Sequence, residues 1–161
     1  MGSYPSSMTI FFKKAYLTLG FFIILYTVAI GQNKTIDSLE NSYNTGLFIE
    51  EDRFSILLDL AENHPDPEKA LAFSEELIQT AVTMDSLNYR IQGHLYKGNA
   101  LKIKGDLSNA LENYFISEKI AIDEEKNREL GIVKITIADL YSNVENHSYA
   151  IKYYQEAIDI L

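Results

Sequence analysis

The chain has 161 residues, of which 47% are hydrophobic and 23% charged, so it is long enough for one domain with a packed core and is not expected to be disordered throughout. Its formal net charge is −9, and residues 32–161 hold 12 basic against 23 acidic side chains, which disfavours binding to nucleic acid or to an anionic membrane surface. The chain contains no cysteine, which excludes disulfides, thiolate metal sites and a thiol nucleophile.

Residues 1–31 are predicted to be a secretory signal peptide. A basic pair, Lys13 and Lys14, is followed by a run of 16 mainly apolar residues. Ala29 and Gly31 place small residues at the two positions that a signal peptidase reads. We therefore expect cleavage after Gly31 and an exported protein.

An uncleaved membrane anchor is the alternative interpretation of the same segment. The apolar run at residues 15–30 is shorter than the ~20 residues that a membrane-spanning helix needs, which favours cleavage. Met8 gives a more usual signal start than Met1, because the basic pair then follows within a few residues. The expected location is the periplasm, with the protein either free or anchored in the membrane and facing the periplasm.

An internal repeat of 40 residues follows a linker or short helix at residues 32–49. Three alanines define the repeat, Ala70, Ala110 and Ala150, and an Asp or Asn stands four residues before each of them. Self-similarity at such a period is typical of helical-repeat proteins. Three units are expected within residues 50–161, at about 50–84, 91–124 and 131–161.

Each unit is predicted to fold as a helix, a tight turn and a second helix. Asp66 and Asp106 are suited to accept hydrogen bonds from the first free N–H groups of a helix, and Pro67 suits a first helical turn. Gly105 can take the positive φ that ends a helix. Apolar residues recur at offsets 0, 1, 4, 7, 8 and 11 from Ala150, which is one stripe of an amphipathic helix. We therefore predict an all-α solenoid of stacked helix pairs and no β-sheet.

The units resemble the tetratricopeptide repeat family, whose pattern spaces small and aromatic residues along two helices. The third unit matches best, through Ala138, Tyr141, Ala150, Tyr154 and Ala157. The second unit matches through Gly98, Leu101, Ala110, Tyr114 and Ser117, and the first matches weakly. The family's early aromatic residue is Phe54 in the first unit but His94 and Lys134 in the others. The resemblance implies a short right-handed solenoid that holds a peptide or protein segment on its concave face without catalysing a reaction.

The layout also resembles the exported portions of Bacteroidetes signalling proteins. The segments that carry this resemblance are Ile36–Leu39, Leu57–Ala61 and Asp66–Ala70, after a predicted signal peptide. This implies an alternative function, in which the chain is a truncated sensory input region of a membrane histidine kinase or transcriptional regulator. The output domain of such a protein is missing from the sequence, and we expect the chain to be a fragment.

The family's groove positions supply the candidate partner-binding residues. They are Asn63, Gln92, Asn99, Lys102, Asp139 and Asn143. Asparagine amides both donate and accept hydrogen bonds, which suits a peptide backbone. Tyr114, Tyr141 and Tyr154 are interpreted as core residues. The last predicted helix is expected to leave an apolar face exposed, so self-association through it is a further expectation.

Catalytic, cofactor and metal sites are not expected. His64, His94 and His147 do not stand at the spacing of metal ligands on a helix, and Asp123–Glu125 lacks the alternating ligands and central glycine of a calcium loop. Glycine-rich phosphate loops and a nucleophile elbow are missing from the sequence. A binding module is therefore the favoured interpretation.

Overall fold

The structure, a computed structural model, describes residues 35–161. The chain divides into two compact units after Ser38, and the second unit, Leu39–Leu161, contains helices α2 to α7. The predicted signal peptide at residues 1–31 and the alternative anchor at 15–30 lie outside the described residues. Within the described part, no helix is long and apolar enough to cross a membrane.

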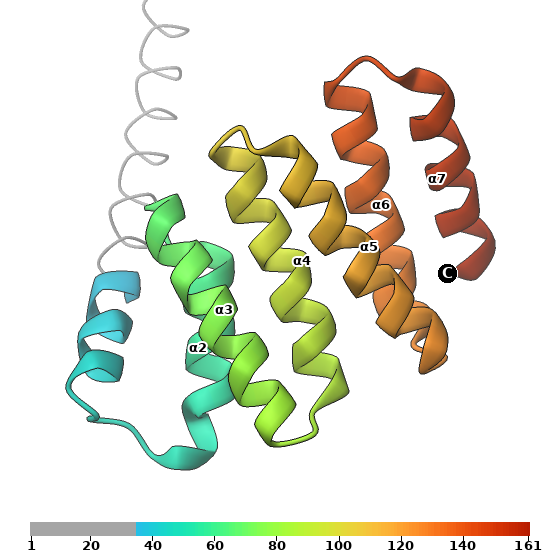
Figure 1. Ribbon diagram of the computed structural model, residues 1–161. Coiled ribbons are helices and arrows are strands. Elements are labelled where there is room, and N and C mark those ends of the chain that lie inside the picture. Colours follow the sequence, from blue (N-terminus) through green and yellow to red (C-terminus); the bar gives the residue numbers. More distant parts are fainter. Residues whose placement is uncertain (1–34) are drawn as a thin grey trace, which may run out of the picture. The chain divides into compact units, whose positions relative to one another are not determined.

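The described residues form helices and no strands. In chain order the elements are a helix ending at residue 44, the 3-10 helix η1 (Glu50–Asp52), α2 (Arg53–Asn63), α3 (Pro67–Thr83), α4 (Leu87–Ile103), α5 (Leu107–Asp123), α6 (Asn127–Asn143) and α7 (His147–Ile160). Each helix from α2 to α7 packs against the next, and α2 also contacts α4 (Figure 1). The predicted all-α class and the packing of consecutive helices are therefore confirmed. Helices α4 and α6 begin at Leu87 and Asn127, four residues before the starts expected from the sequence.

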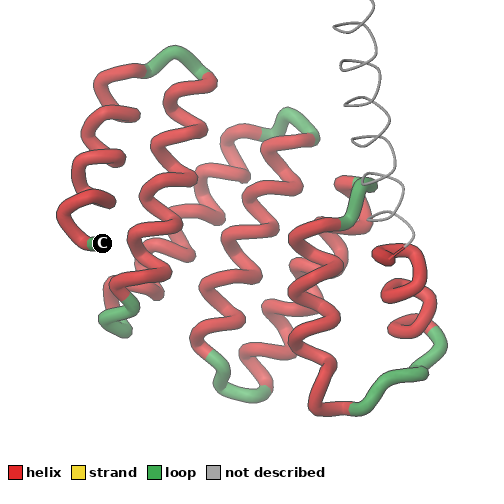
Figure 2. Tube along the Cα trace, turned by 180° about the vertical axis from the view of Figure 1, so that it is seen from behind, coloured by secondary structure: helices red, strands yellow, loops and turns green. Residues whose placement is uncertain are grey.

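Four of the five junctions between successive helices from α2 to α7 use the same three-residue turn, and these junctions are the loops drawn in green in Figure 2. The middle residue of each turn has a positive φ, and these residues are Asp85, Gly105, Glu125 and Glu145. The middle N–H donates to the carbonyl three residues back, and the next N–H donates to the carbonyl five residues back. This is the Schellman pattern, which satisfies the last free carbonyls of a helix. Because the turns recur every 20 residues, α3 to α6 are each 17 residues long.

Two of the predicted helix caps are present. The Asp66 side chain accepts a hydrogen bond from the N–H of Glu68, and Pro67 occupies the first turn of α3. Asp106 accepts one from the N–H of Asn109 at the start of α5. Asn146 makes no such bond at the start of α7, and it accepts the hydroxyl of Ser148 instead.

The core follows the helix crossings. Ala70, Ala110 and Ala150 are all buried, as their small size at a repeated position suggests. Gly98 of α4 lies against Tyr114 of α5: a Cβ added at Gly98 would come within 2.4 Å of the tyrosine ring. The missing side chain therefore sets the close approach of these two helices.

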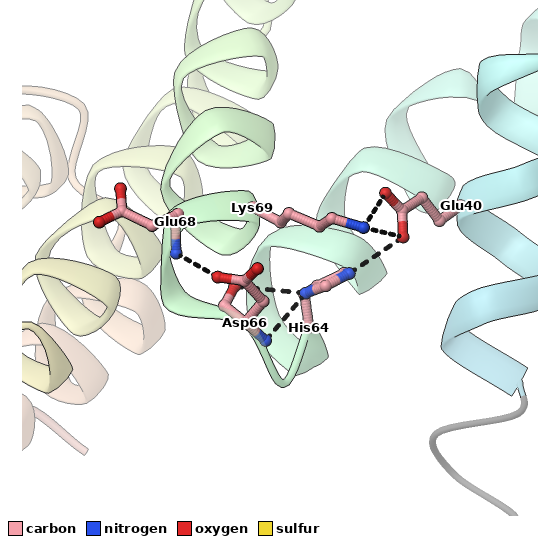
Figure 3. A network of polar contacts seen from close by, with 5 residues as sticks. All are labelled: Glu40, His64, Asp66, Glu68 and Lys69. Atoms are coloured by element: carbon pink, nitrogen blue, oxygen red, sulfur yellow. Dashed lines mark hydrogen bonds and ion pairs between the residues drawn. The ribbon is translucent and has the colours of Figure 1, made fainter.

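The first helix pair is covered by the helical segment at residues 39–44. Glu40 accepts hydrogen bonds from Lys69 Nζ at 2.7 and 3.0 Å, and His64 Nε2 lies 3.1 Å from the same carboxylate (Figure 3). Because the Glu40 carboxylate can only accept, His64 Nε2 donates to it, while Nδ1 lies close to both the N–H and the carbonyl oxygen of Asp66. Tyr43 stacks on Phe48 with 5.2 Å between ring centroids. The edge formed by α2 and α3 is thus occupied by polar and aromatic contacts.

Candidate functional site

A hydrogen bond between the two helices of a unit recurs at the 40-residue spacing. Tyr114 of α5 donates its hydroxyl to Asn99 of α4 at 2.7 Å. Forty residues later, Tyr154 of α7 donates its hydroxyl to Asp139 of α6. Tyr114 is fully buried, and burial raises the pKa of its hydroxyl, whereas Tyr154 is partly exposed. Asn99 and Asp139 therefore hold the position of a tyrosine within their own unit.

The other four predicted partner-binding residues lie on α2, α4 and α6. Asn63 and Asn143 are exposed at the last positions of α2 and α6. Lys102 is half-buried in the last turn of α4, and Gln92 is half-buried with its side-chain oxygen lacking a hydrogen-bond partner. Among the described residues, no hydrogen bond or ion pair joins any of the six predicted residues to another. The six residues are spread over α2, α4 and α6 and do not form one cluster.

One repeated position is occupied by three different residue types, and each has its own partner. Phe54 of α2 stacks face to face on Tyr89, with ring centroids 4.3 Å apart. His94 of α4 and Lys134 of α6 stand 40 and 80 residues later. The structure shows what each of these three residues contacts.

His94 lies in a depression of about 410 Å³ between α3, α4 and α5. Its Nδ1 is 3.1 Å from Asn113 Oδ1, and the Asn113 amide nitrogen donates to a backbone carbonyl, so Nδ1 is the donor. Burial lowers the pKa of His94 and the positive charges of Lys97 and Arg90 lower it further, against the opposing hydrogen bond to Asn113. The surroundings therefore favour the neutral form of the imidazole.

The floor and rim of this depression differ in character. Leu71, Leu101 and Ile116 supply apolar surface, and Lys97 Nζ forms an ion pair with Glu75 Oε1 at 2.9 Å on the rim. The volume falls within the range of small-ligand sites, but the depression is open to solvent. The sequence analysis did not identify it, because its lining comes from three helices and lacks a recognisable spacing.

Lys134 is buried between α5, α6 and α7. Its Nζ lies 2.6 Å from Glu118 Oε1 and 2.6 Å from Glu156 Oε2, and it stands 5.2 Å from the ring centroid of Tyr153. Burial disfavours the ammonium, but the hydrogen bonds to the two carboxylates outweigh it and raise the pKa of Lys134. The cluster fixes three helices to one another and has the features of a structural ion pair.

The polar features of these sites are hydrogen bonds, ion pairs and an open depression. Within residues 35–161, no group of three or more histidine, aspartate and glutamate side chains is arranged to hold a metal ion. His64 and Glu40 form a carboxylate–histidine pair, and the second ring nitrogen, Nδ1, lies 3.0 Å from the backbone nitrogen and 3.2 Å from the backbone carbonyl oxygen of Asp66. Asn63 and Asn143 present exposed amides on α2 and α6, and each amide can donate and accept a hydrogen bond.

Within the described residues, these observations define an all-α protein of consecutively packed helices. No protein-family model matches the chain, and no curated protein or solved structure matches it.

Proposed function

We propose that this chain is an exported helical-repeat module of the tetratricopeptide type that binds a peptide or protein segment and catalyses no reaction. The observation that carries the proposal is the recurrence, at the same 40-residue spacing, of the Tyr114–Asn99 and Tyr154–Asp139 hydrogen bonds. A repeat that conserves its internal contacts presents the equivalent helix face again in each unit. Such serial surfaces are what solenoid proteins use to hold extended partners.

The proposed binding surface is the face of α2, α4 and α6 that carries Asn63, Lys102 and Asn143. Within the described residues, no hydrogen bond or ion pair engages these three side chains. Asn99 and Asp139 are reassigned to positioning roles, because their oxygens already accept tyrosine hydroxyls. The amides that remain can each donate to and accept from a peptide backbone.

The partner that suits this surface is a neutral or basic segment. The chain carries a formal net charge of −9, so a strongly acidic partner would be repelled over the range of the screened field. The support for this choice is electrostatic, and it predicts that binding of a basic peptide weakens as salt is added.

The test is selection from a displayed library of random peptides, followed by affinity measurements on variants. We expect that Asn63→Ala, Lys102→Ala and Asn143→Ala each weaken the affinity for the selected peptides by about fivefold or more. Each substitution removes a hydrogen-bonding group. Glu112→Ala on α5 is the matched control and should leave affinity unchanged. Equal affinity in all four variants, or loss only with Glu112→Ala, would refute the assigned surface.

Export is tested separately, by the mass and location of the product of the 161-residue chain in an expressing bacterium. A periplasmic product that begins at Gln32 supports the free exported module. An uncut product in the membrane supports the anchored form, and an uncut cytoplasmic product contradicts export.

A further inference from the structure

The depression beside His94 lies at positions that carry aromatic rings in the third unit. Three residues that line it are leucine or asparagine, and the residues 40 positions later are all tyrosine. The corresponding residues are Leu101 and Tyr141, Asn109 and Tyr149, and Asn113 and Tyr153. The Tyr141 ring centroid lies 5.1 Å from that of Tyr149 and 5.8 Å from that of Tyr153. The third unit therefore holds a cluster of rings at the positions where the second unit has shorter side chains and a depression.

In the first unit, a tyrosine from another segment covers the equivalent surface of α3. Phe73, 40 residues before Asn113, meets the ring of Tyr43 edge-on, with 6.1 Å between the ring centroids. Tyr43 belongs to the helix that precedes α2, and its hydroxyl donates to Glu76, 40 residues before Ile116. A phenol ring from outside α3 thus lies on the helix positions that, in α5, border the depression.

The lining of the depression combines apolar surface with an unpaired hydrogen-bond acceptor. Leu71, Leu101 and Ile116 provide the apolar part. His94 Nδ1 donates to Asn113, whose side chain is buried at 8% exposure and fixes the imidazole ring. In the neutral ring Nε2 is then an acceptor, and among the described residues it has no hydrogen-bond partner. A planar ring that carries a hydroxyl group matches both features, because its body is apolar and its edge donates a hydrogen bond.

The charges that line the depression favour a cationic ligand. They are two carboxylates, Glu75 and Glu112, and one ammonium, Lys97. Lys97 Nζ pairs with Glu75 at 2.9 Å, whereas Glu112 forms no ion pair among the described residues. Arg90 carries the other positive charge that acts on His94, and it does not line the depression. An ammonium group on the ligand is therefore attracted by an unpaired carboxylate, with a strength that salt reduces.

We infer that the depression beside His94 binds a small phenolic amine. The phenol ring lies on the apolar surface of Leu71 and Leu101, the hydroxyl donates to His94 Nε2, and the ammonium group lies beside Glu112. The residues of the proposed peptide-binding face, Asn63, Lys102 and Asn143, do not line this depression, so either proposal can fail without the other. Because the depression is open to solvent and the ligand is small, we expect a dissociation constant on the order of 0.1–1 mM.

The first test titrates tyramine into the product of the 161-residue chain and follows the nuclear magnetic resonance signals of single residues. Saturable shifts are expected at the His94 ring and at the methyl groups of Leu71 and Leu101. Phenethylamine, which lacks the hydroxyl, should bind about 2- to 10-fold more weakly, and 4-hydroxyphenylacetate, which replaces the ammonium by a carboxylate, should also bind more weakly. The inference is overturned by no saturable shift up to about 10 mM tyramine, by shifts only at other residues, or by tighter binding of the acid.

A second test fills the depression with the residue type that the third unit carries. Asn109→Tyr places a ring at the position of Tyr149 and should weaken tyramine binding about fivefold or more, since the added ring competes for the same space. Ser108→Tyr is the matched control, because Ser108 is exposed on the same helix and does not line this depression. Circular dichroism should show the wild-type helix content in both variants. Wild-type affinity in Asn109→Tyr, or an equal loss in Ser108→Tyr, would contradict the assigned site.

A third test isolates the hydrogen bond to His94. His94→Phe supplies the residue type that stands 40 positions earlier, at Phe54, and removes the acceptor while keeping a flat ring. Tyramine and phenethylamine should then bind with equal affinity, because the hydroxyl no longer has a partner at this position. A residue that only supports the fold would change both affinities by the same factor. Persistence of the wild-type preference for tyramine in His94→Phe would refute the role of His94 Nε2 as the acceptor.

Discussion

Replacing Gly98 by alanine is expected to destabilise the protein, although alanine is the better helix former. A Cβ at this position would lie 2.4 and 2.6 Å from two ring atoms of Tyr114 and 3.0 Å from the carbonyl oxygen of Ala110. The tyrosine is fully buried and its hydroxyl is bonded to Asn99 at 2.7 Å, so the ring cannot easily move aside. The helices α4 and α5 must separate instead.

The two opposing effects have known sizes. Overpacking of a closed core costs about 2–3 kcal/mol when backbone segments must shift, and glycine in a helix interior is about 1 kcal/mol worse than alanine. The expected net change is a loss of about 1–2 kcal/mol in the free energy of unfolding. Urea denaturation followed by far-ultraviolet circular dichroism measures it, provided that the slope with denaturant is unchanged.

A double-mutant cycle identifies the cause of this loss. In Tyr114→Phe the ring no longer has its hydroxyl bond to Asn99, so it can move and the added methyl group of Gly98→Ala should cost less. A Gly98→Ala protein as stable as the wild type would refute the steric argument, and an unchanged cost in the Tyr114→Phe background would show that the hydroxyl bond does not hold the ring in place.

Three further predictions concern single positions. Glu125→Gly should stabilise the protein by about 0.5–1 kcal/mol, because Glu125 has a φ of 53° in its turn. Gly105→Ala, at a φ of 83°, should destabilise the protein by about 1 kcal/mol. The denaturant midpoints of the two variants and the wild type measure both changes. Burial lowers the pKa of His94 below its ordinary value of 6.5, so the unfolded chain binds protons more readily and stability should fall as the pH drops below 6.5. Unfolding curves at several pH values should show this fall in the wild type and a smaller one in His94→Gln. Lys134→Met should lower the free energy of unfolding by about 2–3 kcal/mol, toward the low end for a broken buried pair because one carboxylate partner is 37% exposed. Substituting both partner glutamates by glutamine in that variant should recover part of the loss. No recovery would count against an electrostatic origin.

The sequence predicts the helices well because their ends carry local chemistry. Asp66 and Asp106 cap their helices as expected, and Gly105 takes the expected positive φ. The same turn is built at Asp85 and Glu125, and neither residue predicts a positive φ as glycine does. This explains why the first helices of the second and third units begin earlier than their apolar pattern suggests.

The contacts of the predicted site were less accessible to sequence reasoning. Asn99 stands at a predicted groove position, and its spacing of 15 residues from Tyr114 is too long to reveal a contact between two helices. The depression beside His94 depends on three helices and on a buried asparagine, Asn113, whose burial no local pattern encodes. Surfaces of this kind depend on how helices cross, and crossing angles are set by packing rather than by periodicity.

The substitutions at one repeated position explain how similar helices keep their order. Phe54 stacks on an aromatic ring, His94 bonds to an amide, and Lys134 needs two carboxylates. If α4 occupied the place of α6, the carboxylates that pair with Lys134 would lose their cation, and the buried lysine would face an amide and no opposite charge. Each exchange leaves a buried polar group without its partner. The free-energy cost of that loss is larger than the difference in apolar contacts between one helix order and another. The departures from an aromatic repeat pattern therefore specify which helix packs against which neighbour, while the shared alanines and turns specify how closely they approach.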